Sequence, residues 1–342
     1  MLSAASFSGI LASFCCGANA APSFPKIAPG DRLGINIHFT DPKPGELGMI
    51  AATGAKWVRM DFTWAHTEKV KGQYDFSAYD RLLAALDKYG MHAILILNYG
   101  NPLYADAGDK QPFTSRAGTA EFRAAFSAWA AAAVSHFSGR GCLWEIWNEP
   151  NYKMFWAPAP NSGEYVALAK AAAAAIRRVA PDEPLIGPAS STIDFKFLED
   201  CFRGGLLEEL SAVSVHPYRR TAPSTVAADY LRLRDLIAKY APAGREIPII
   251  SSEWGCSSSW SGFDDQKQAE FLKRELSTNL AAGIPLSIWY DWRDDGVSAD
   301  DPEHRFGLVR HDYHPGANPP YEAKPAYAAF QEVAARAGQG TP

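Results

Sequence analysis

Cysteine is scarce in this sequence, and its spacing matches no metal site. Only 5 of the 342 residues are cysteine, and none forms the paired C-x₂-C motifs that are typical of zinc modules. Cys142, Cys201 and Cys256 lie beyond the first twenty residues. An odd number leaves at least one thiol unpaired. The spacing allows a Cys201–Cys256 disulfide, whereas Cys142 opens an apolar run as a small core residue would.

Positive charge and long apolar runs are lacking too. Lysine and arginine number 33 against 38 acidic residues, which gives a net charge of −5. Because proteins that bind nucleic acid present a clustered basic surface, we expect no nucleic-acid partner. Beyond the N-terminus no apolar run is long enough to cross a bilayer, so we predict no membrane span.

The first twenty residues have the features of an export signal. Residues 2–16 are apolar and small, and Ala18-Asn19-Ala20 before Ala21 fits a small-x-small cleavage site. No lysine or arginine precedes the apolar stretch, which departs from the usual pattern. Lipidation at Cys15-Cys16 is an alternative, disfavoured by the bulky Phe14. We expect a signal peptide over residues 1–20 and a secreted or periplasmic protein in which residues 21–342 form one domain.

Strand-like and helix-like segments alternate along the rest of the chain. Most of the strand-like runs are continuously apolar, as in strands that are buried on both faces. The predicted strands are 33–38, 56–61, 92–98, 142–148, 185–189, 212–216, 247–253 and 286–292. Helical spacing indicates helices at 77–89, 119–137, 163–180, 226–240 and 266–282, with a last helix opening at Lys324-Pro325. Eight such units predict an α/β fold, a single (β/α)₈ TIM barrel. An open doubly wound sheet is the alternative, but no glycine-rich phosphate loop follows the first strand.

The ends of these predicted strands carry chemically active side chains. In a closed barrel the carboxyl ends of the strands surround the active site. The side chains at these ends are His38, Arg59, Asp61, Asn98, Asn148, Glu149, His216, Tyr218, Glu253, Trp289 and Trp292. Glu149 and Glu253 end the fourth and seventh strands and can therefore face each other across the mouth. Hydrolysis of a glycosidic bond requires two carboxyl groups placed in this way.

Two motifs at those strand ends resemble a known group of enzymes. The segment Trp144-Glu145-Ile146-Trp147-Asn148-Glu149-Pro150-Asn151 resembles the Asn-Glu-Pro signature of glycoside hydrolase clan A, and Ser252-Glu253-Trp254-Gly255 resembles its nucleophile segment. Weaker similarities are Val58-Arg59-Met60-Asp61, His216-Pro217-Tyr218, Phe306-Gly307-Leu308 and Lys324-Pro325-Ala326-Tyr327. Within the clan the chain is most similar to families 39 and 5. Family 39 enzymes usually carry an additional β-sandwich, whereas we expect a barrel alone here.

The resemblance implies a retaining glycosidase that acts on β-linked carbohydrate and needs no cofactor or metal. Glu149 would be the acid/base and Glu253 the nucleophile. Asn148 would bind the sugar 2-hydroxyl, Arg59 and Tyr218 would hold Glu253 ionised, and His216 would join the same network. Trp289 would stack on a sugar ring. The predicted substrate-binding set is completed by Trp292, His38 and Asn98.

Some polar residues near these motifs have simpler interpretations. Glu145 is predicted to be a structural carboxylate inside the barrel. The acidic loop of Asp291, Asp294, Asp295, Asp300 and Asp301 is expected to be solvated, with calcium binding as an alternative. Arg219 and Arg220 could recognise an acidic sugar, although a solvated pair is favoured.

Two other functions compete with the glycosidase. A catalytically silent barrel could bind glycans without needing both glutamates. A metal-dependent barrel hydrolase would commonly place two histidines, one residue apart, at the end of the first strand. This chain has Asn36-Ile37-His38 there instead.

Overall fold

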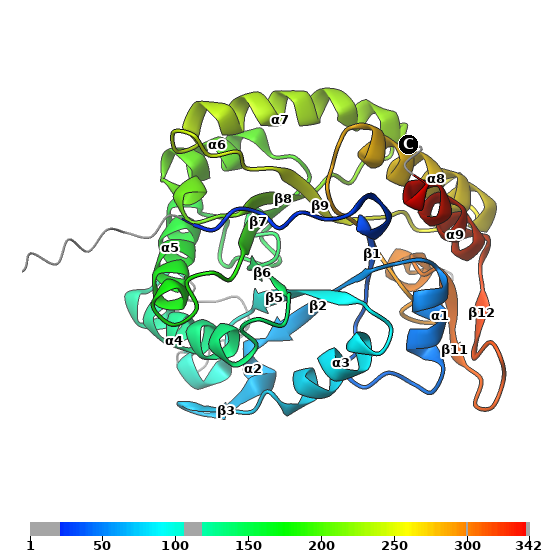
Figure 1. Ribbon diagram of the computed structural model, residues 1–342, viewed down its shortest axis with the longest axis horizontal. Helices are drawn as coiled ribbons and strands as arrows, with labels where there is room; N and C mark the ends of the chain where they lie inside the picture. The colour runs from blue at the N-terminus through cyan, green and yellow to red at the C-terminus, as the bar shows by residue number, and fades with distance from the viewer. Residues whose placement is uncertain (1–20, 106–117, 299, 340–342) are drawn as a thin grey trace, which may run out of the picture.

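Eight parallel strands close into a barrel, as predicted. The computed structural model describes residues 21–105, 118–298 and 300–339, and the expected signal peptide lies outside them. Around the ring, each strand pairs with the next, and β10 pairs with β1 to close it (Figure 1). In ring order the strands are β1 (Leu33–Asn36), β2 (Trp57–Thr63), β5 (His92–Asn98), β6 (Leu143–Ile146), β7 (Leu185–Ser191), β8 (Ala212–His216), β9 (Ile249–Trp254) and β10 (Ser287–Trp289).

The strands were recognisable because they are buried on both faces. The segments β5 and β8 have the predicted bounds, and every other strand overlaps its prediction. One buried cluster fills the inside of the ring with Trp57, Ile94, Leu143, Ile186, Ala212, Ile250, Leu286 and Ile288. A larger cluster lies between the strands and the surrounding helices. This two-sided burial makes each strand an apolar run, without polar alternation.

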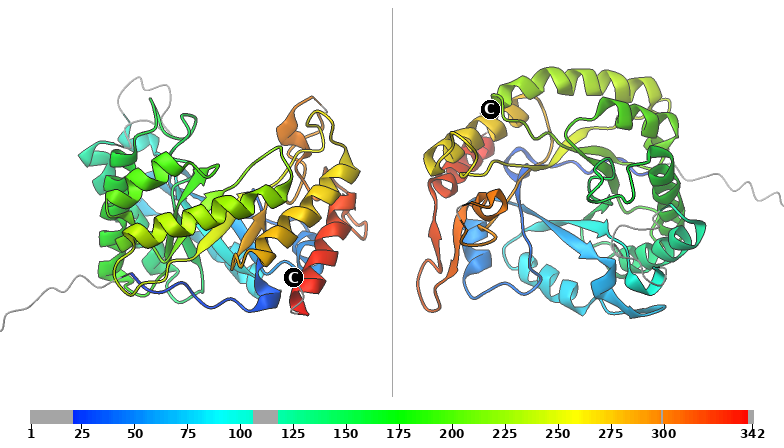
Figure 2. Two further views of the ribbon diagram at one scale, coloured as in Figure 1. Left: turned by 90° about the horizontal axis from the view of Figure 1, so that it is seen from above. Right: turned by 180° about the vertical axis from the view of Figure 1, so that it is seen from behind.

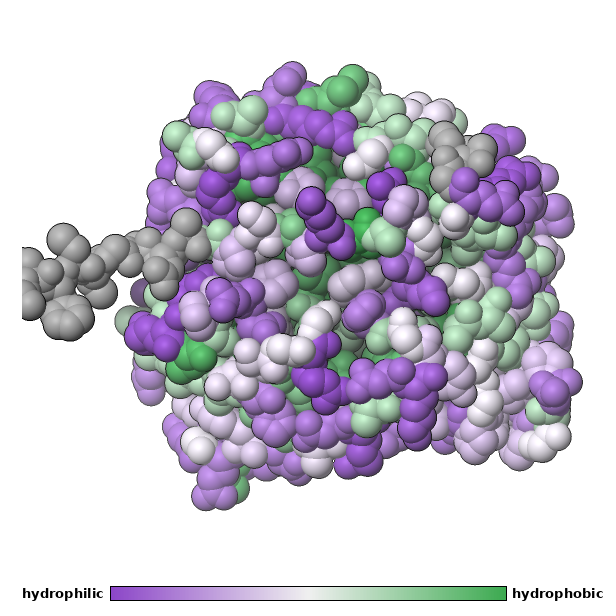
Figure 3. Space-filling view, in the orientation of Figure 1, coloured by the Kyte–Doolittle hydropathy of each residue, from purple (hydrophilic) through white to green (hydrophobic). Residues whose placement is uncertain are grey.

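The N-terminal segment 21–31 covers one end of the barrel. Phe24 and Ile27 of this segment pack against the cluster inside the ring, and the segment crosses the face turned to the viewer in Figure 1. The space-filling view of that face shows mostly hydrophilic side chains, with small apolar areas between them (Figure 3). Because this segment leads into the start of β1, it covers the amino ends of the strands, and their carboxyl ends lie at the other end.

Helices surround the ring, and most were expected. They are α1 (Glu46–Ala52), α2 (Trp64–Thr67), α3 (Ser77–Asp87), α4 (Ala120–His136), α5 (Ser162–Val179), α6 (Phe195–Arg203), α7 (Val226–Tyr240), α8 (Asp265–Ala281) and α9 (Pro325–Gly338). Side chains cap several of them: Thr119 accepts from the Phe122 amide at the start of α4, and Asp264 from the Lys267 amide at the start of α8. Within the described residues, no helix is both long and apolar enough to cross a membrane.

The prediction missed several short elements. Helices α1 and α6 have only 7 and 9 residues, too few for a clear helical period. The small antiparallel pairs β3 (Glu68–Val70) with β4 (Gln73–Tyr74), and β11 (Val309–Tyr313) with β12 (Tyr321–Ala323), lie outside the barrel. In the left view of Figure 2 the N-terminal segment lies at the bottom, and the loop after β10, in orange, rises at the top.

The three cysteines of the described region are buried, unpaired thiols. The disulfide between Cys201 and Cys256 that the spacing allowed is therefore not formed. Cys201 lies on the inner face of α6, whereas Cys256 follows β9. Burial raises the pKa of the Cys142 thiol to about 12, so it stays protonated and acts as a small core residue, as expected.

Candidate active site

Arg59 is the centre of a buried polar network inside the barrel mouth. Its side chain is 1% exposed, so its charge must be neutralised by neighbours. Its Nε donates to Glu145 Oε2 at 2.7 Å, its Nη1 to Glu253 Oε2 at 2.5 Å, and its Nη2 to Asn148 Oδ1 at 2.7 Å. Glu145 is fully buried and has the structural role that the sequence predicted. One guanidinium thus fixes side chains from β6 and β9 relative to β2.

Glu253 is held as a carboxylate. The Tyr218 hydroxyl donates to its Oε1 at 2.9 Å, while Arg59 binds its other oxygen. Burial by itself raises the pKa of Glu253. The electrostatic effects of His216 and Arg59, together with the hydrogen bonds from Tyr218 and Arg59, outweigh burial and bring the pKa below its ordinary value. Glu253 is therefore ionised at neutral pH.

Glu149 faces Glu253 from the other side of the mouth. The chain turns sharply after β6, with Trp147 at φ 68° and Glu149 at φ 46°, a left-handed conformation that non-glycine residues seldom adopt. The Glu149 amide donates to the Ala189 carbonyl at 3.0 Å, which helps to hold this turn. Its Oε1 lies 2.9 Å from His216 Nδ1. One carboxylate oxygen of Glu149 comes within 4.8 Å of one of Glu253.

These groups line a cleft of about 760 Å³, called the main cleft below. Such a volume fits a small-molecule site. Its wall includes six of the predicted residues, namely Glu149, Glu253, Asn148, Arg59, Tyr218 and His38. His216 is fully buried behind Glu149. The barrel therefore brings together most of the residues that the sequence singled out.

Besides His216, three predicted residues lie outside this wall. Trp289 and Trp292 are 0% and 1% exposed and belong to the cluster between strands and helices, so the predicted sugar stacking by Trp289 is wrong. Successive side chains of a strand point to opposite faces, and it is the next residue, Tyr290, that lines the main cleft. Trp292 donates to Glu46 instead. Asn98 is buried and donates to Asp61.

Sequence reasoning missed several aromatic residues of the cleft. Tyr99, Phe155, Trp260 and Tyr290 line it, together with Phe306, which the sequence had indicated only as part of the Phe306-Gly307-Leu308 motif. Each follows a barrel strand within a loop, where hydrophobic periodicity gives no signal. Tyr99 and Tyr290 come directly after strand-end residues that had been chosen, so attention to the neighbouring position could have found them.

Two groups near the mouth have the spacing of metal ligands. They are Glu149, His216 and Glu253, and His38, Asp291 and Asp295. In the first group, the Arg59 guanidinium binds Glu253 directly and disfavours a cation there. In the second, His38 Nε2 lies 3.4 Å from Asp291 Oδ2. Burial raises the pKa of Asp291 to about 7, and neither of its carboxylate oxygens has a hydrogen-bond partner among the described residues.

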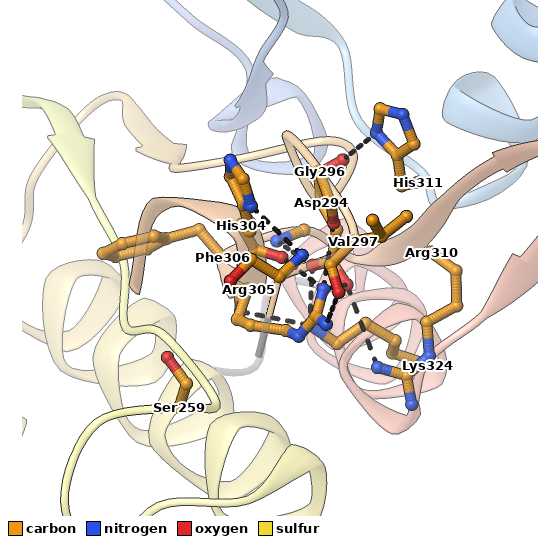
Figure 4. Close-up of polar contacts among 12 residues, drawn as sticks. Ser259, Asp294, Gly296, Val297, His304, Arg305, Phe306, Arg310, His311 and Lys324 are labelled. Atoms are coloured by element: carbon orange, nitrogen blue, oxygen red, sulfur yellow. Dashed lines mark hydrogen bonds and ion pairs between the residues drawn. The ribbon is translucent and has the colours of Figure 1, made fainter. Parts of the chain in front are cut away.

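The loop after β10 is fixed from below by a buried ion pair. Lys324 Nζ lies 2.9 Å from Asp294 Oδ1, and both side chains are fully buried (Figure 4). Lys324 also donates to the Arg305 carbonyl, and the Gly307 amide donates to Asp294. The acidic loop is therefore divided, with Asp294 in this network and Asp295, Asp300 and Asp301 exposed, as a solvated loop would be. The network positions Phe306 in the main cleft.

Replacement of Lys324 by methionine is expected to destabilise the protein by about 3 kcal/mol, the lower end of the range for a broken buried ion pair. It removes the buried cation bonded to Asp294, whereas Arg305 and Arg310 remain at 3.8 Å. Urea unfolding gives this free energy. The matched control is Lys273→Met, which removes an exposed ion pair with Glu332 and should cost no more than about 1 kcal/mol. Equal effects of both substitutions would show that the Asp294–Lys324 pair does not fix this loop.

The pH profile should report the contact between Tyr218 and Glu253. The substitution Tyr218→Phe removes a donor to the charged carboxylate, so the pKa of Glu253 rises towards its ordinary value. For any activity that needs this carboxylate ionised, the fall in rate on the acid side should then occur at a higher pH than in the wild type. Its rate should fall by about 10–100-fold, since hydrogen bonds to charged groups contribute about 1.5–3 kcal/mol. Tyr152→Phe, which removes a hydroxyl elsewhere in the cleft wall, should leave the pH profile unchanged.

Comparison with known proteins connects this geometry to one enzyme family. The model of glycosyl hydrolases family 39 matches residues 53–269. Among curated proteins, none matches the chain in sequence. A family 39 glycoside hydrolase from the gut symbiont Bacteroides cellulosilyticus WH2 is 25% identical, with a TM-score of 0.76 over 91% of this chain. The chain covers 65% of that protein.

Two further structures share the fold at lower identity. A monomeric β-xylosidase from Caulobacter crescentus CB15 is 19% identical, with a TM-score of 0.69 over 92% of this chain and 69% of its own. A GH5_18 protein from Streptomyces cattleya, in complex with GlcNAc, is 16% identical, with a TM-score of 0.68 over 94% of this chain and 82% of its own. Families 39 and 5 are the two that the sequence motifs had indicated.

Proposed function

Because this chain belongs to family 39 of the glycosyl hydrolases, we propose that it hydrolyses β-linked glycans or oligosaccharides with retention of configuration. Glu253 is the nucleophile and Glu149 the acid/base. The observation that carries the proposal is the facing pair of carboxyl groups, whose nearest oxygens lie within 4.8 Å. Retaining enzymes place these groups about 5–5.5 Å apart, whereas inverting enzymes need about 6.5–9.5 Å to admit a water molecule.

In the first step Glu253 attacks the anomeric carbon of the bound sugar. Arg59 donates a hydrogen bond to one carboxylate oxygen of Glu253, and Tyr218 donates to the other. The nucleophile is therefore ionised and oriented before substrate arrives. The bond from the anomeric carbon to the leaving oxygen breaks. Glu149 gives its proton to that oxygen, and a covalent glycosyl–Glu253 ester remains.

In the second step a water molecule replaces the leaving group. Glu149, now a carboxylate, takes a proton from this water as its oxygen attacks the anomeric carbon. The ester bond breaks, and Glu253 leaves as a carboxylate. His216 contacts Glu149 at 2.9 Å and fixes its side chain between the two steps. Asn148, oriented by Arg59, is placed to bind the sugar 2-hydroxyl.

A panel of aryl β-glycosides and β-linked polysaccharides tests this function. The purified protein should release aryl alcohol from at least one of them. The double variant Glu149→Ala/Glu253→Gln, purified in parallel, should release none and so controls for contaminating enzymes. A protein that binds glycans but cleaves no member of the panel would instead be the catalytically silent barrel.

A further inference from the structure

A second hollow adjoins the main cleft at the ends of β1 and β2. It measures about 540 Å³ and is called the side hollow below. His38 and Asp61 belong to the walls of both the main cleft and the side hollow. The other walls come from residues 39–41 after β1, from α2, and from the first turn of α3. The two hollows therefore meet at these two side chains.

The position of the side hollow in the ring indicates which end of the substrate it contacts. In the ring of eight strands, β1 and β2 lie opposite β7 and β8. His216 of β8 binds Glu149, and Ser191, Arg219 and Arg220 line the main cleft on that side. The leaving group departs where Glu149 delivers its proton. On the side of β1 and β2, Arg59 contacts Glu253, so the side hollow is assigned to the side of the sugar that Glu253 attacks.

The walls of the side hollow have the chemistry of a sugar-binding site. Thr40, Thr63 and Ser77 offer hydroxyl groups, and Phe39 offers a partly buried apolar face. Three carboxylates, Asp41, Asp61 and Asp75, line it, whereas no lysine or arginine of the described residues does. Hydroxyl groups of a sugar can bond to these oxygens, but a uronic acid would be repelled by like charge.

We propose that the side hollow is a second glycone subsite, which binds the next, uncharged sugar unit on the non-reducing side of the bond to be cleaved. This inference rests on the proposed function and makes it more specific. The protein then acts on oligosaccharides or on internal bonds of a neutral chain, in preference to removing single terminal sugars.

Kinetics with matched substrates test the subsite. The aryl β-glycoside of a neutral disaccharide should show a kcat/KM at least about tenfold higher than that of the corresponding monosaccharide. One or two net hydrogen bonds in the subsite suffice for this ratio. Equal values for the two substrates would overturn the proposal.

A variant that fills the side hollow should remove the preference. Ala78 lines the hollow from the first turn of α3 and is absent from the wall of the main cleft. In Ala78→Trp the ratio should fall to about 1, while kcat/KM for the monosaccharide substrate changes less than about twofold. The control Ala84→Trp places the same ring on the exposed side of α3 and should keep the ratio. Equal losses on both substrates in Ala78→Trp would contradict the subsite.

A milder variant and a binding experiment complete the test. His66 is exposed and lines the side hollow. The substitution His66→Ala adds no bulk and should lower the ratio of the two kcat/KM values by about threefold, as the loss of one weak hydrogen bond does. Calorimetry on Glu253→Gln compares xylobiose, cellobiose and mannobiose with their monosaccharides. At least one disaccharide should bind about tenfold more tightly than its monosaccharide, and Ala78→Trp should abolish the difference. This readout needs no turnover, so failure of the hydrolase proposal and failure of the subsite are distinguishable.

Discussion

Replacement of Glu253 by glutamine is expected to abolish nearly all turnover and to leave the fold intact. An amide cannot form the glycosyl ester, whereas its oxygen can still accept the hydrogen bond from Arg59. Arg59 also keeps its bonds to Glu145 and Asn148, so the network survives. The loss should be at least about 100-fold. Glu303→Gln, which changes a carboxylate of the same cleft outside the network, should cost less than about tenfold.

A small anion should partly restore the truncated variant. In Glu253→Ala the space of the carboxylate is free, and azide can enter it and attack the anomeric carbon in its place. The expected product is a glycosyl azide of inverted configuration, because only one displacement then occurs. Retention of more than about a tenth of the wild-type rate by Glu253→Gln would show that Glu253 is not the nucleophile.

The second large effect concerns Glu149 and depends on the leaving group. Truncation to alanine removes the proton donor, so natural glycosides, whose leaving groups are poor, should lose about 10²–10⁴-fold in kcat/KM. A dinitrophenyl glycoside needs no proton to depart, and its kcat/KM should fall by less than about tenfold. Steady-state kinetics of both substrates on the same preparation measure the contrast. Losses of equal size would give Glu149 a role other than acid catalysis.

The fold and the carboxyl pair could be predicted because they depend on strong local signals. Strands buried on both faces are apolar runs, and a barrel places the residue after each run at one mouth. Glu149 follows β6, and Glu253 lies near the end of β9. The two carboxyl groups could therefore be expected to face each other without any knowledge of the loops. Arg59 could be placed because it lies on β2 between apolar neighbours, Val58 and Met60.

The aromatic lining depended on details that are not written in the local pattern. Along β10, Ile288 belongs to the cluster inside the ring, and the next side chain of a strand points to the other face. Trp289 therefore packs under the helices, and Tyr290 lines the cleft. Trp260 and Phe306 reach it from loops whose positions are set by tertiary contacts such as the Asp294–Lys324 pair.

The central claim is double displacement through Glu253, and the configuration of the first product tests it most directly. Proton NMR can follow hydrolysis of an aryl β-glycoside before the released sugar mutarotates. With the carboxyl oxygens within 4.8 Å, the account predicts that the β-anomer appears first and that the α-anomer accumulates only later. If the α-anomer appears first, the two glutamates act by single displacement, and no glycosyl–Glu253 intermediate exists.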